Sequence, residues 1–263
     1  MSSNVIKFDD GAAYERYMGR WSQLAGQVFL DWLKPQPGSR WLDVGCGNGA
    51  FTELIIDRCS PAGVHGVDPA EGQLAFARTR PAARMASFSL GDAMALPFAD
   101  RSFDIAVMPL VIFFVPNPLA GVAEMRRVTA PGGLVSAYAW DMYGGGFPYH
   151  PLQAQLRELG VSVPSPPSPE ASRLDTLREL WALAGLEAIE TTQIVVQRTF
   201  NSFDDYWSTV LGGPSVAATL AALSADDIAT LQAALRRCLP AAAADGSITC
   251  SARANAVKGR VPS

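Results

Sequence analysis

WLDVGCGNGA, residues 41–50, places three glycines at alternate positions directly after a short apolar run. The next segment, FTELII, has apolar residues spaced for one face of a helix. A strand, a glycine-rich turn and a helix in this order predict a loop whose backbone approaches a ligand closely. Gly45, Gly47 and Ala50 match the G-x-G-x-x-G/A pattern of a dinucleotide pyrophosphate site. Gly45, Gly47 and Gly49 also match a second pattern, which includes Asp43 before them.

Asp43 stands two residues before the first glycine, and its charge distinguishes the two patterns. A carboxylate is unfavourable close to a pyrophosphate and favourable close to a cation. S-adenosylmethionine carries a positive sulfonium and a positive ammonium, and backbone N–H groups at a helix N-terminus can hold its carboxylate. The pattern D-x-G-x-G-x-G at Asp43, Gly45, Gly47 and Gly49 therefore favours S-adenosylmethionine over NAD. The alternative role for Asp43 is to cap the following turn.

Short apolar runs alternate with helical patterns from about residue 40 to 140, which is typical of a parallel sheet covered by helices. The predicted strands are residues 40–45, 63–68, 86–92, 103–109, 133–140, 187–200 and 247–259. Pro109 is placed at the exit of the fourth strand, because proline breaks a ladder in mid-strand. We predict an α/β fold with a Rossmann-like, doubly wound, mostly parallel seven-stranded sheet and an antiparallel last strand.

The regions outside this core lack the regular alternation of strands and helices. Helical spacing before residue 34 predicts N-terminal helices, and a mostly helical stretch separates the last two predicted strands. The sequence is therefore interpreted as one domain over residues 1–263, with the cofactor-binding core at about 38–140. Substrate-binding or cap elements are expected at about 1–37, 141–172 and 201–246, the last inserted as a helical cap between the last two strands.

Composition and charge exclude several classes of protein. Of the 263 residues, 49% are hydrophobic and 17% are charged, which is typical of a globular protein with a buried core. A net charge of −4 gives no concentrated basic face for nucleic acid. The apolar run at 105–115 is too short for a membrane span. We expect a cytoplasmic monomer or homodimer that binds a small-molecule substrate, with no nucleic acid and no membrane insertion.

The cysteines point to no special chemistry. They lie far apart without C-x-x-C spacing, so neither a metal site nor a disulfide framework is predicted. The four are Cys46, Cys59, Cys238 and Cys250. Cys46 lies in the glycine loop, where a small residue fits for steric reasons, and no histidine stands beside it. We therefore do not expect Cys46 to be a nucleophile.

Asp68 ends the second predicted strand about 20 residues beyond the glycines, where a doubly wound fold presents the acid that binds a ribose. Its two oxygens can accept hydrogen bonds from both ribose hydroxyls. The alternative role is an N-cap for the helix that begins near Pro69. A dinucleotide-binding protein would carry the same acid, so Asp68 supports a ribose without identifying the cofactor.

Five motifs in register give a specific resemblance. These are LDVGCGNGA, GVDPA, GDAMALPFADRSFD, FDIAVMPLVIFFVPNP and RRVTAPGGL. Over about residues 40–140 the chain resembles the class I S-adenosylmethionine-dependent methyltransferase family, in particular its ubiquinone/menaquinone-type small-molecule branch. The resemblance implies S-adenosylmethionine as cofactor and S-adenosylhomocysteine as product.

The resemblance also implies a set of cofactor-binding residues. They are Tyr14, Arg20, Asp43, Gly45, Cys46, Gly47, Asp68, Pro69, Gln73, Asp92, Ala93, Met94 and Pro109. In this set Asp92 lies near the adenine amine, Pro109 lies near the sulfonium, and Arg20 pairs with the methionine carboxylate. The alternative for the N-terminal segment is that Tyr14 and Tyr17 pack a helix and that Arg20 is solvated.

The acceptor is expected to contact the regions outside the core. Six aromatic residues are candidates for an apolar acceptor pocket: Trp140, Tyr143, Phe147, Tyr149, Tyr206 and Trp207. The alternative is that these aromatics form the core of the cap. The sequence carries MPLV where amino-methylating relatives have N/D-P-P-Y/F, which disfavours adenine or glutamine N-methylation.

Methyl transfer from a sulfonium is an in-line displacement, so alignment and desolvation supply much of the acceleration. A base is required only where the acceptor must lose a proton. The catalytic residue is unknown from the sequence, and the two weak candidates are His150 and Asp141. His65 is expected to be structural.

The leading hypothesis is methyl transfer to a small molecule whose identity the sequence does not determine. One alternative is a non-catalytic protein that binds S-adenosylmethionine or S-adenosylhomocysteine on the same fold. Another is an NAD-dependent oxidoreductase, which is disfavoured by Asp43 and by the lack of a Tyr/Lys or His/Asp pair at known spacing.

Overall fold

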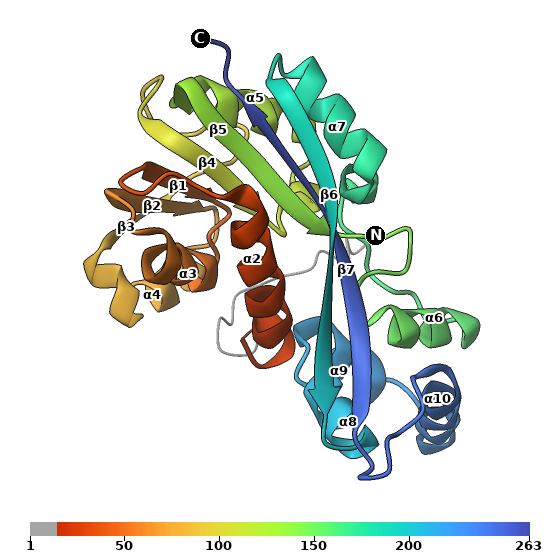
Figure 1. Ribbon diagram of the computed structural model, residues 1–263. Helices are drawn as coiled ribbons and strands as arrows, with labels where there is room; N and C mark the ends of the chain where they lie inside the picture. Colours follow the sequence, from red (N-terminus) through yellow and green to blue (C-terminus); the bar gives the residue numbers. More distant parts are fainter. Residues whose placement is uncertain (1–14) are drawn as a thin grey trace.

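A computed structural model describes residues 15–263. Seven strands form one sheet in the order β3-β2-β1-β4-β5-β7-β6 (Figure 1). Their bounds are β1 (Arg40–Val44), β2 (Gly63–Asp68), β3 (Ala86–Leu90), β4 (Phe103–Pro109), β5 (Thr129–Trp140), β6 (Glu187–Phe200) and β7 (Ile248–Arg260). Strands β1 to β5 pair in parallel, whereas β7 is antiparallel to both β5 and β6. The predicted fold class is confirmed.

The strand order reverses between β1 and β4, which pair in parallel although two strands lie between them in the chain. Right-handed crossovers that run in opposite directions from this point place their helices on opposite faces of the sheet. In open sheets of this kind, ligands bind outside the carboxyl ends of the strands at the reversal point. A ligand site is therefore expected at the loops after β1 and β4.

The helices cover the sheet and form the cap. Their bounds are η1 (Glu15–Gly19), α2 (Arg20–Leu33), α3 (Ala50–Cys59), α4 (Glu71–Ala77), η2 (Pro81–Arg84), η3 (Ile112–Phe114), α5 (Pro118–Val128), α6 (His150–Glu158), η4 (Pro169–Ser172), α7 (Leu174–Leu183), α8 (Phe203–Leu211), α9 (Pro214–Ala221) and α10 (Ala225–Cys238). Helix α2 packs against α3, β6 and β7, and helices α5 and α7 pack against each other. Within residues 15–263, no helix combines the length and apolarity that a membrane crossing requires.

Close packing docks α2 on the core. Phe29 of α2 lies against Tyr138 of β5, with ring centroids 4.6 Å apart. A Cβ at Gly26 would lie 2.9 Å from Leu54 and 3.1 Å from Phe51, both on α3. The absence of a side chain at Gly26 therefore lets α2 and α3 approach each other closely.

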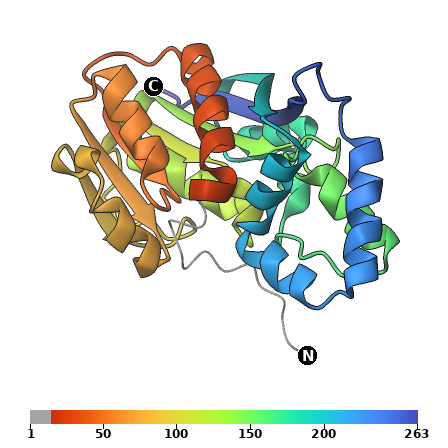
Figure 2. The ribbon, with the colours of Figure 1, turned by 90° about the horizontal axis from the view of Figure 1, so that it is seen from below.

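The cap helices α8, α9 and α10 lie between β6 and β7 in the sequence, as predicted. Strands β6 and β7 pair from Glu187 and Arg260 to Phe200 and Ile248, whereas β5 ends at Trp140. The β6–β7 pair therefore extends beyond the rest of the sheet. Figure 2 shows the blue cap helices together on one side of the molecule and the orange and yellow elements around β2 and β3 on the other.

Helix α6 was not predicted, because residues 141–150 are rich in glycine and proline. Its buried Leu152 and Leu156 are four residues apart and form one apolar stripe. Contacts with α10 complete its packing. This helix is stabilised by tertiary contacts and not by local helix propensity, since isolated helices of this length are marginal.

Candidate functional site

The glycine loop after β1 has left-handed backbone at three positions: φ is +72° at Gly45, +52° at Gly47 and +79° at Gly49. Side chains with a Cβ disfavour this conformation. The N–H groups of Gly45 and Cys46 donate to the Val67 carbonyl at 2.7 and 3.1 Å. These bonds tie the loop to the end of β2, at the carboxyl edge of the sheet.

The loop after β4 packs directly on the glycine loop. A Cβ at Gly45 would lie 2.5 and 2.6 Å from the two methyl carbons of Val111, closer than real carbon atoms approach. The backbone at Leu110 is also left-handed, with φ +61°, and its N–H donates to the Tyr138 carbonyl at 2.7 Å. A left-handed non-glycine residue is uncommon and is held here by the surrounding contacts. Pro109 ends β4 as predicted.

Asp68 joins the glycine loop to the start of α4. One carboxylate oxygen accepts from the Gly47 N–H at 2.9 Å, and the other accepts from the Ala70 N–H at 2.9 Å. Burial raises the pKa of Asp68, and the two backbone hydrogen bonds oppose this rise. Asp68 does not cap α4, whose N-cap position is Ala70 without a side-chain cap bond. Each carboxylate oxygen has a second lone pair for another donor.

Asp43 is fully buried, with 0% of its surface exposed. One oxygen accepts from the Thr52 hydroxyl at 2.7 Å. Among the described residues, its other oxygen, Oδ1, has no hydrogen-bond partner. Desolvation raises the pKa of Asp43 to about 7, against the Thr52 hydrogen bond, which lowers it. The carboxylate therefore bonds to a side chain on α3, and the N-cap position of α3, Gly49, receives no side-chain bond.

The other predicted residues near the glycine loop lie at the same edge. Gln73 of α4 is buried, and its Oε1 lies 3.9 Å from where a Cβ at Gly47 would be. Asp92 accepts from the Met94 N–H at 2.8 Å and forms a short bridge with Ala95. The loop after β3 therefore turns back at Asp92. Pro69 is exposed, and Ala93 is partly buried.

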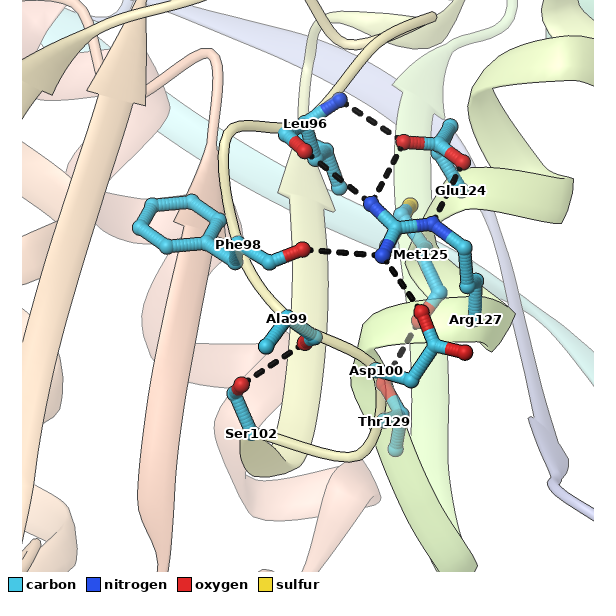
Figure 3. Close-up of polar contacts among 9 residues, drawn as sticks. All are labelled: Leu96, Phe98, Ala99, Asp100, Ser102, Glu124, Met125, Arg127 and Thr129. Atoms are coloured by element: carbon cyan, nitrogen blue, oxygen red, sulfur yellow. Dashed lines mark hydrogen bonds and ion pairs between the residues drawn. The ribbon is translucent and has the colours of Figure 1, made fainter.

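Arg127 of α5 holds the loop after β3 in place (Figure 3). Its two Nη atoms donate to the carbonyls of Leu96 and Phe98 at 3.0 and 2.8 Å. They also bond to Asp100 and Glu124, and Nε bonds to Glu124 at 2.7 Å. All five guanidinium N–H groups are thus used. Hydrogen bonds to Glu124 and Asp100 raise the pKa of Arg127, and Arg127 lowers the pKa of Glu124.

An apolar cavity of about 130 Å³ opens beside the exits of β4 and β5. The core contributes Leu110, Phe113, Phe114 and Trp140, and the remaining wall comes from the N-terminal segment, the loop after β5, helix α6, the segment 162–166 and the cap. Those other lining residues are Tyr17, Met18, Met142, Phe147, Leu152, Gln153, Leu156, Ser162, Val163, Pro164, Pro166, Gly213, Val216 and Thr219. Two adjacent residues thus contact the cavity and the glycine loop, because Leu110 lines the cavity and Val111 covers Gly45.

The six predicted substrate-binding aromatics divide between this wall and other positions. Trp140 and Phe147 line the cavity. Tyr149 and Tyr206 are fully buried and pack in the cap core, where burial raises the pKa of Tyr149 to about 12. Trp207 stacks on a neighbouring phenylalanine of α8.

Tyr143 does not line the cavity. It is 54% exposed, and its hydroxyl donates to Glu170 at 2.9 Å. Four of the six aromatics therefore do not line the cavity, because three of them pack the cap and Tyr143 bonds outside it. A role of these four in acceptor binding stays a prediction without support from their positions.

Neither weak candidate for a base lines the cavity. Asp141 is bound by Arg253, whose Nε and Nη2 donate to one carboxylate oxygen at 3.0 and 2.6 Å. Its other oxygen accepts from the Gly144 N–H at 2.8 Å. This arrangement fastens the loop after β5 to β7. His150 begins α6, and its ring lies 3.4 Å from where a Cβ at Gly145 would be.

The remaining predictions concern the thiol, the N-terminal segment and His65. Cys46 is buried, and burial with nearby Asp43 and Asp68 raises the pKa of its thiol well above the usual value, which disfavours a thiolate. Tyr14 lies outside the described residues. Arg20 is exposed on α2 and donates to Gln23 at 3.1 Å. His65 bonds to Ser89 of β3 at 2.8 Å, as expected for a structural role.

Sequence reasoning missed several residues of this site. Val111 and Arg127 act through contacts with residues distant in the sequence, and Thr52 bonds to Asp43, nine residues before it. The sequence indicates only a helix-packing role for Tyr17, whereas the structure places it in the cavity wall. The apolar run after β4 was a usable signal for the cavity, since Leu110, Phe113 and Phe114 follow a buried strand.

Comparisons with known proteins agree with this geometry. Residues 42–137 match the family described as "Methyltransferase domain". The chain is 41% identical over 110 residues to the ubiquinone/menaquinone biosynthesis C-methyltransferase of Paracoccus denitrificans, covering 40% of this chain and 44% of that protein. It is 40% identical over 136 residues to the demethylmenaquinone methyltransferase of Staphylococcus aureus, covering 51% of this chain and 52% of that protein. The chain thus spans about half the length of these curated relatives.

A solved structure extends the likeness in fold. Phosphoethanolamine N-methyltransferase 2 of Haemonchus contortus, in complex with phosphomonomethylethanolamine and S-adenosylhomocysteine, has a TM-score of 0.60 and 18% sequence identity. The match covers 98% of this chain and 61% of that one. At this identity the likeness shows the fold alone.

Replacing Arg127 with alanine tests the anchoring of the loop after β3. We expect the free energy of unfolding to fall by about 2–4 kcal/mol, because the change removes the hydrogen bonds of Arg127 to Glu124, Asp100 and the carbonyls of Leu96 and Phe98. Urea unfolding measures the loss, and amide hydrogen exchange in residues 92–100 should become faster. The exposed neighbour Arg126→Ala is the control, with an expected change within about 0.5 kcal/mol. Equal losses in the two variants would contradict the anchoring role.

The raised pKa of Asp43 predicts a pH-dependent stability. Below about pH 4 the carboxyl is protonated in both states, but between about pH 4 and pH 7 only the unfolded chain releases the proton. The contribution of Asp43 to stability is therefore lost as the pH rises through this window. Relative to Asp43→Asn, the wild type should lose on the order of 4 kcal/mol between pH 4 and pH 8. Urea unfolding at a series of pH values measures this.

The exposed Asp31→Asn on α2 is the control for replacing a carboxyl with a carboxamide, and it should change the free energy of unfolding by no more than about 0.5 kcal/mol. Parallel pH profiles for the wild type and Asp43→Asn would mean that Asp43 is ionised in the folded chain throughout.

Proposed function

Since residues 42–137 belong to the class I S-adenosylmethionine-dependent methyltransferase family, we propose that the chain transfers a methyl group from S-adenosylmethionine to a small apolar acceptor. The proposal rests on the contact between the glycine loop and the loop after β4, both at the carboxyl edge of the sheet. Val111 covers Gly45 of the glycine loop, and the preceding residue, Leu110, lines the apolar cavity. A cofactor held by the loop and an acceptor in the cavity would therefore be neighbours.

The residues at the glycine loop fit the chemistry of this cofactor. Asp43 has a buried oxygen without a partner, which a nearby cation would stabilise in its ionised form. Asp68 has free lone pairs for the ribose hydroxyls beside its two backbone hydrogen bonds. Asp92 would bond the adenine amine. The backbone of Gly45, Cys46 and Gly47 would contact the methionine part, as in the proteins that the chain resembles.

When bound, S-adenosylmethionine supplies an electrophilic methyl group on a positive sulfur. The chain's own contribution is to align the acceptor and to exclude water, since the cavity wall is mostly apolar and aromatic. No aspartate, glutamate, histidine or lysine lines the cavity in the part of the chain that the structure describes. We therefore propose an acceptor whose nucleophilic atom needs no base from this wall.

Ligand-dependent thermal stabilisation tests the function. S-adenosylmethionine and S-adenosylhomocysteine should raise the melting temperature of the full chain, because both bind only the folded state. NAD serves as the third arm, and stabilisation by NAD alone would overturn the proposal. A non-catalytic relative would bind the cofactor without producing S-adenosylhomocysteine from any acceptor. Product formation across a panel of small apolar amines and thioethers, whose nucleophilic atoms need no base, therefore distinguishes the two.

Asp68→Ala tests the proposed ribose contact. We expect the affinity for S-adenosylmethionine to fall about 10- to 100-fold, because two charge-assisted hydrogen bonds are lost and the glycine loop loses the bond to Gly47. Isothermal titration calorimetry measures the affinity. Asp31→Ala, an exposed aspartate on α2, is the matched control and should bind as the wild type does. Unchanged affinity in Asp68→Ala would place the ribose elsewhere.

The proposed role of Asp43 predicts that cofactor affinity depends on pH. Below about pH 7 the buried carboxyl is protonated, so the free energy of ionising it reduces the affinity for a cation. Affinity for S-adenosylmethionine should rise up to about tenfold per pH unit and level off above about pH 7. Calorimetry from pH 5.5 to 8.5 measures this rise. Asp43→Asn should bind more weakly and lack it, and the same rise in both would show that Asp43 does not face the cation.

A further inference from the structure

The apolar cavity contains few groups able to form hydrogen bonds to a ligand. Four lining residues carry a hydroxyl or a carboxamide, namely Tyr17, Gln153, Ser162 and Thr219. Ser162 is exposed to solvent, and Thr219 already has an interaction within the protein. Among the described residues, neither the Tyr17 hydroxyl nor the Gln153 carboxamide bonds to another side chain or to the backbone.

Tyr149 contacts both of these residues. The Tyr17 ring stacks on the Tyr149 ring, with centroids 4.3 Å apart and an interplanar angle of 18°. The Gln153 N–H donates to the Tyr149 carbonyl at 3.1 Å, so Gln153 lies one helical turn after Tyr149. Side chains four residues apart on a helix share one face, about 5–6 Å apart at Cβ. Tyr17 and Gln153 therefore both line the cavity and both adjoin Tyr149.

Tyr17 is fixed from three sides. Its ring would lie 2.9 to 3.1 Å from a Cβ at Gly213, so the backbone of the cap packs against it. Its carbonyl accepts from the Tyr149 hydroxyl at 2.7 Å. Burial, with Tyr149 and Tyr206 nearby, raises the pKa of Tyr17 well above the usual value, so the hydroxyl keeps its proton. The group is an oriented hydrogen-bond donor, and it does not act as a base at neutral pH.

We propose that the Tyr17 hydroxyl and the Gln153 carboxamide together bind one neutral oxygen atom, a hydroxyl or a carbonyl, of an otherwise apolar acceptor. The pair thereby orients the acceptor within the cavity. No charged side chain lines the wall among the described residues, so a charged ligand group would lose its hydration without compensation. This inference rests on the proposed function, because it names the acceptor that the same site takes.

The test compares two probes of similar shape, 2-naphthol and 2-methylnaphthalene, binding to the full chain in the presence of S-adenosylhomocysteine. Both fill an apolar cavity, but only 2-naphthol offers an oxygen. Titration followed by naphthalene fluorescence should show that the wild type prefers 2-naphthol by about 5- to 30-fold. Tyr17→Phe and Gln153→Leu should each reduce this preference by about threefold or more, with little change for 2-methylnaphthalene.

Gln155→Leu is the matched control, because it makes the same change on α6 at a position that does not line the cavity. Its preference should equal that of the wild type. Equal binding of the two probes to the wild type, an unchanged preference in both variants, or no binding of either probe would overturn the inference. Thermal stabilisation by S-adenosylhomocysteine is measured for every protein. Its absence in the wild type contradicts the proposed function, whereas a lost preference with stabilisation retained contradicts only the pair.

Discussion

The contact between Val111 and Gly45 is the constraint on which the rest of the site depends. It joins the loops after β1 and β4, the two strands at which the sheet reverses its order. A side chain at position 45 would collide with the valine and would also disfavour the left-handed backbone. Leu110, whose backbone is left-handed, lines the cavity and directly precedes Val111, so the loop after β4 contacts both the cavity and the glycine loop.

Two buried acids show how this site combines structure with binding. Asp68 satisfies two backbone N–H groups and so shapes the glycine loop while keeping lone pairs for a ligand. Asp43 has one oxygen bonded to Thr52 and one without a partner among the described residues, and its pKa is raised to about 7. A buried acid with an unsatisfied oxygen lowers stability and is understandable where a cation completes its environment.

The cavity depends on long-range packing at the other end of the sheet. The β6–β7 pair extends beyond β5 and carries the cap, while Arg253 binds Asp141 and fastens the loop after β5. Tyr149 then links the N-terminal segment to α6 through its stack on Tyr17. The wall therefore comes from segments that are far apart in the sequence. Its few polar groups are held by neighbours that no short motif specifies.

The sequence by itself determined the sheet, the position of Pro109 at a strand exit, the cap between the last two strands and the glycine loop with Asp43 and Asp68. These features follow from local periodicity and backbone requirements, which depend on residues close together in the chain. Only the tertiary structure decided that Trp140 and Phe147 line the cavity while Tyr149 and Tyr206 pack the cap. Aromatic residues have the same local preferences in either place, so their role is set by which distant segments pack against them.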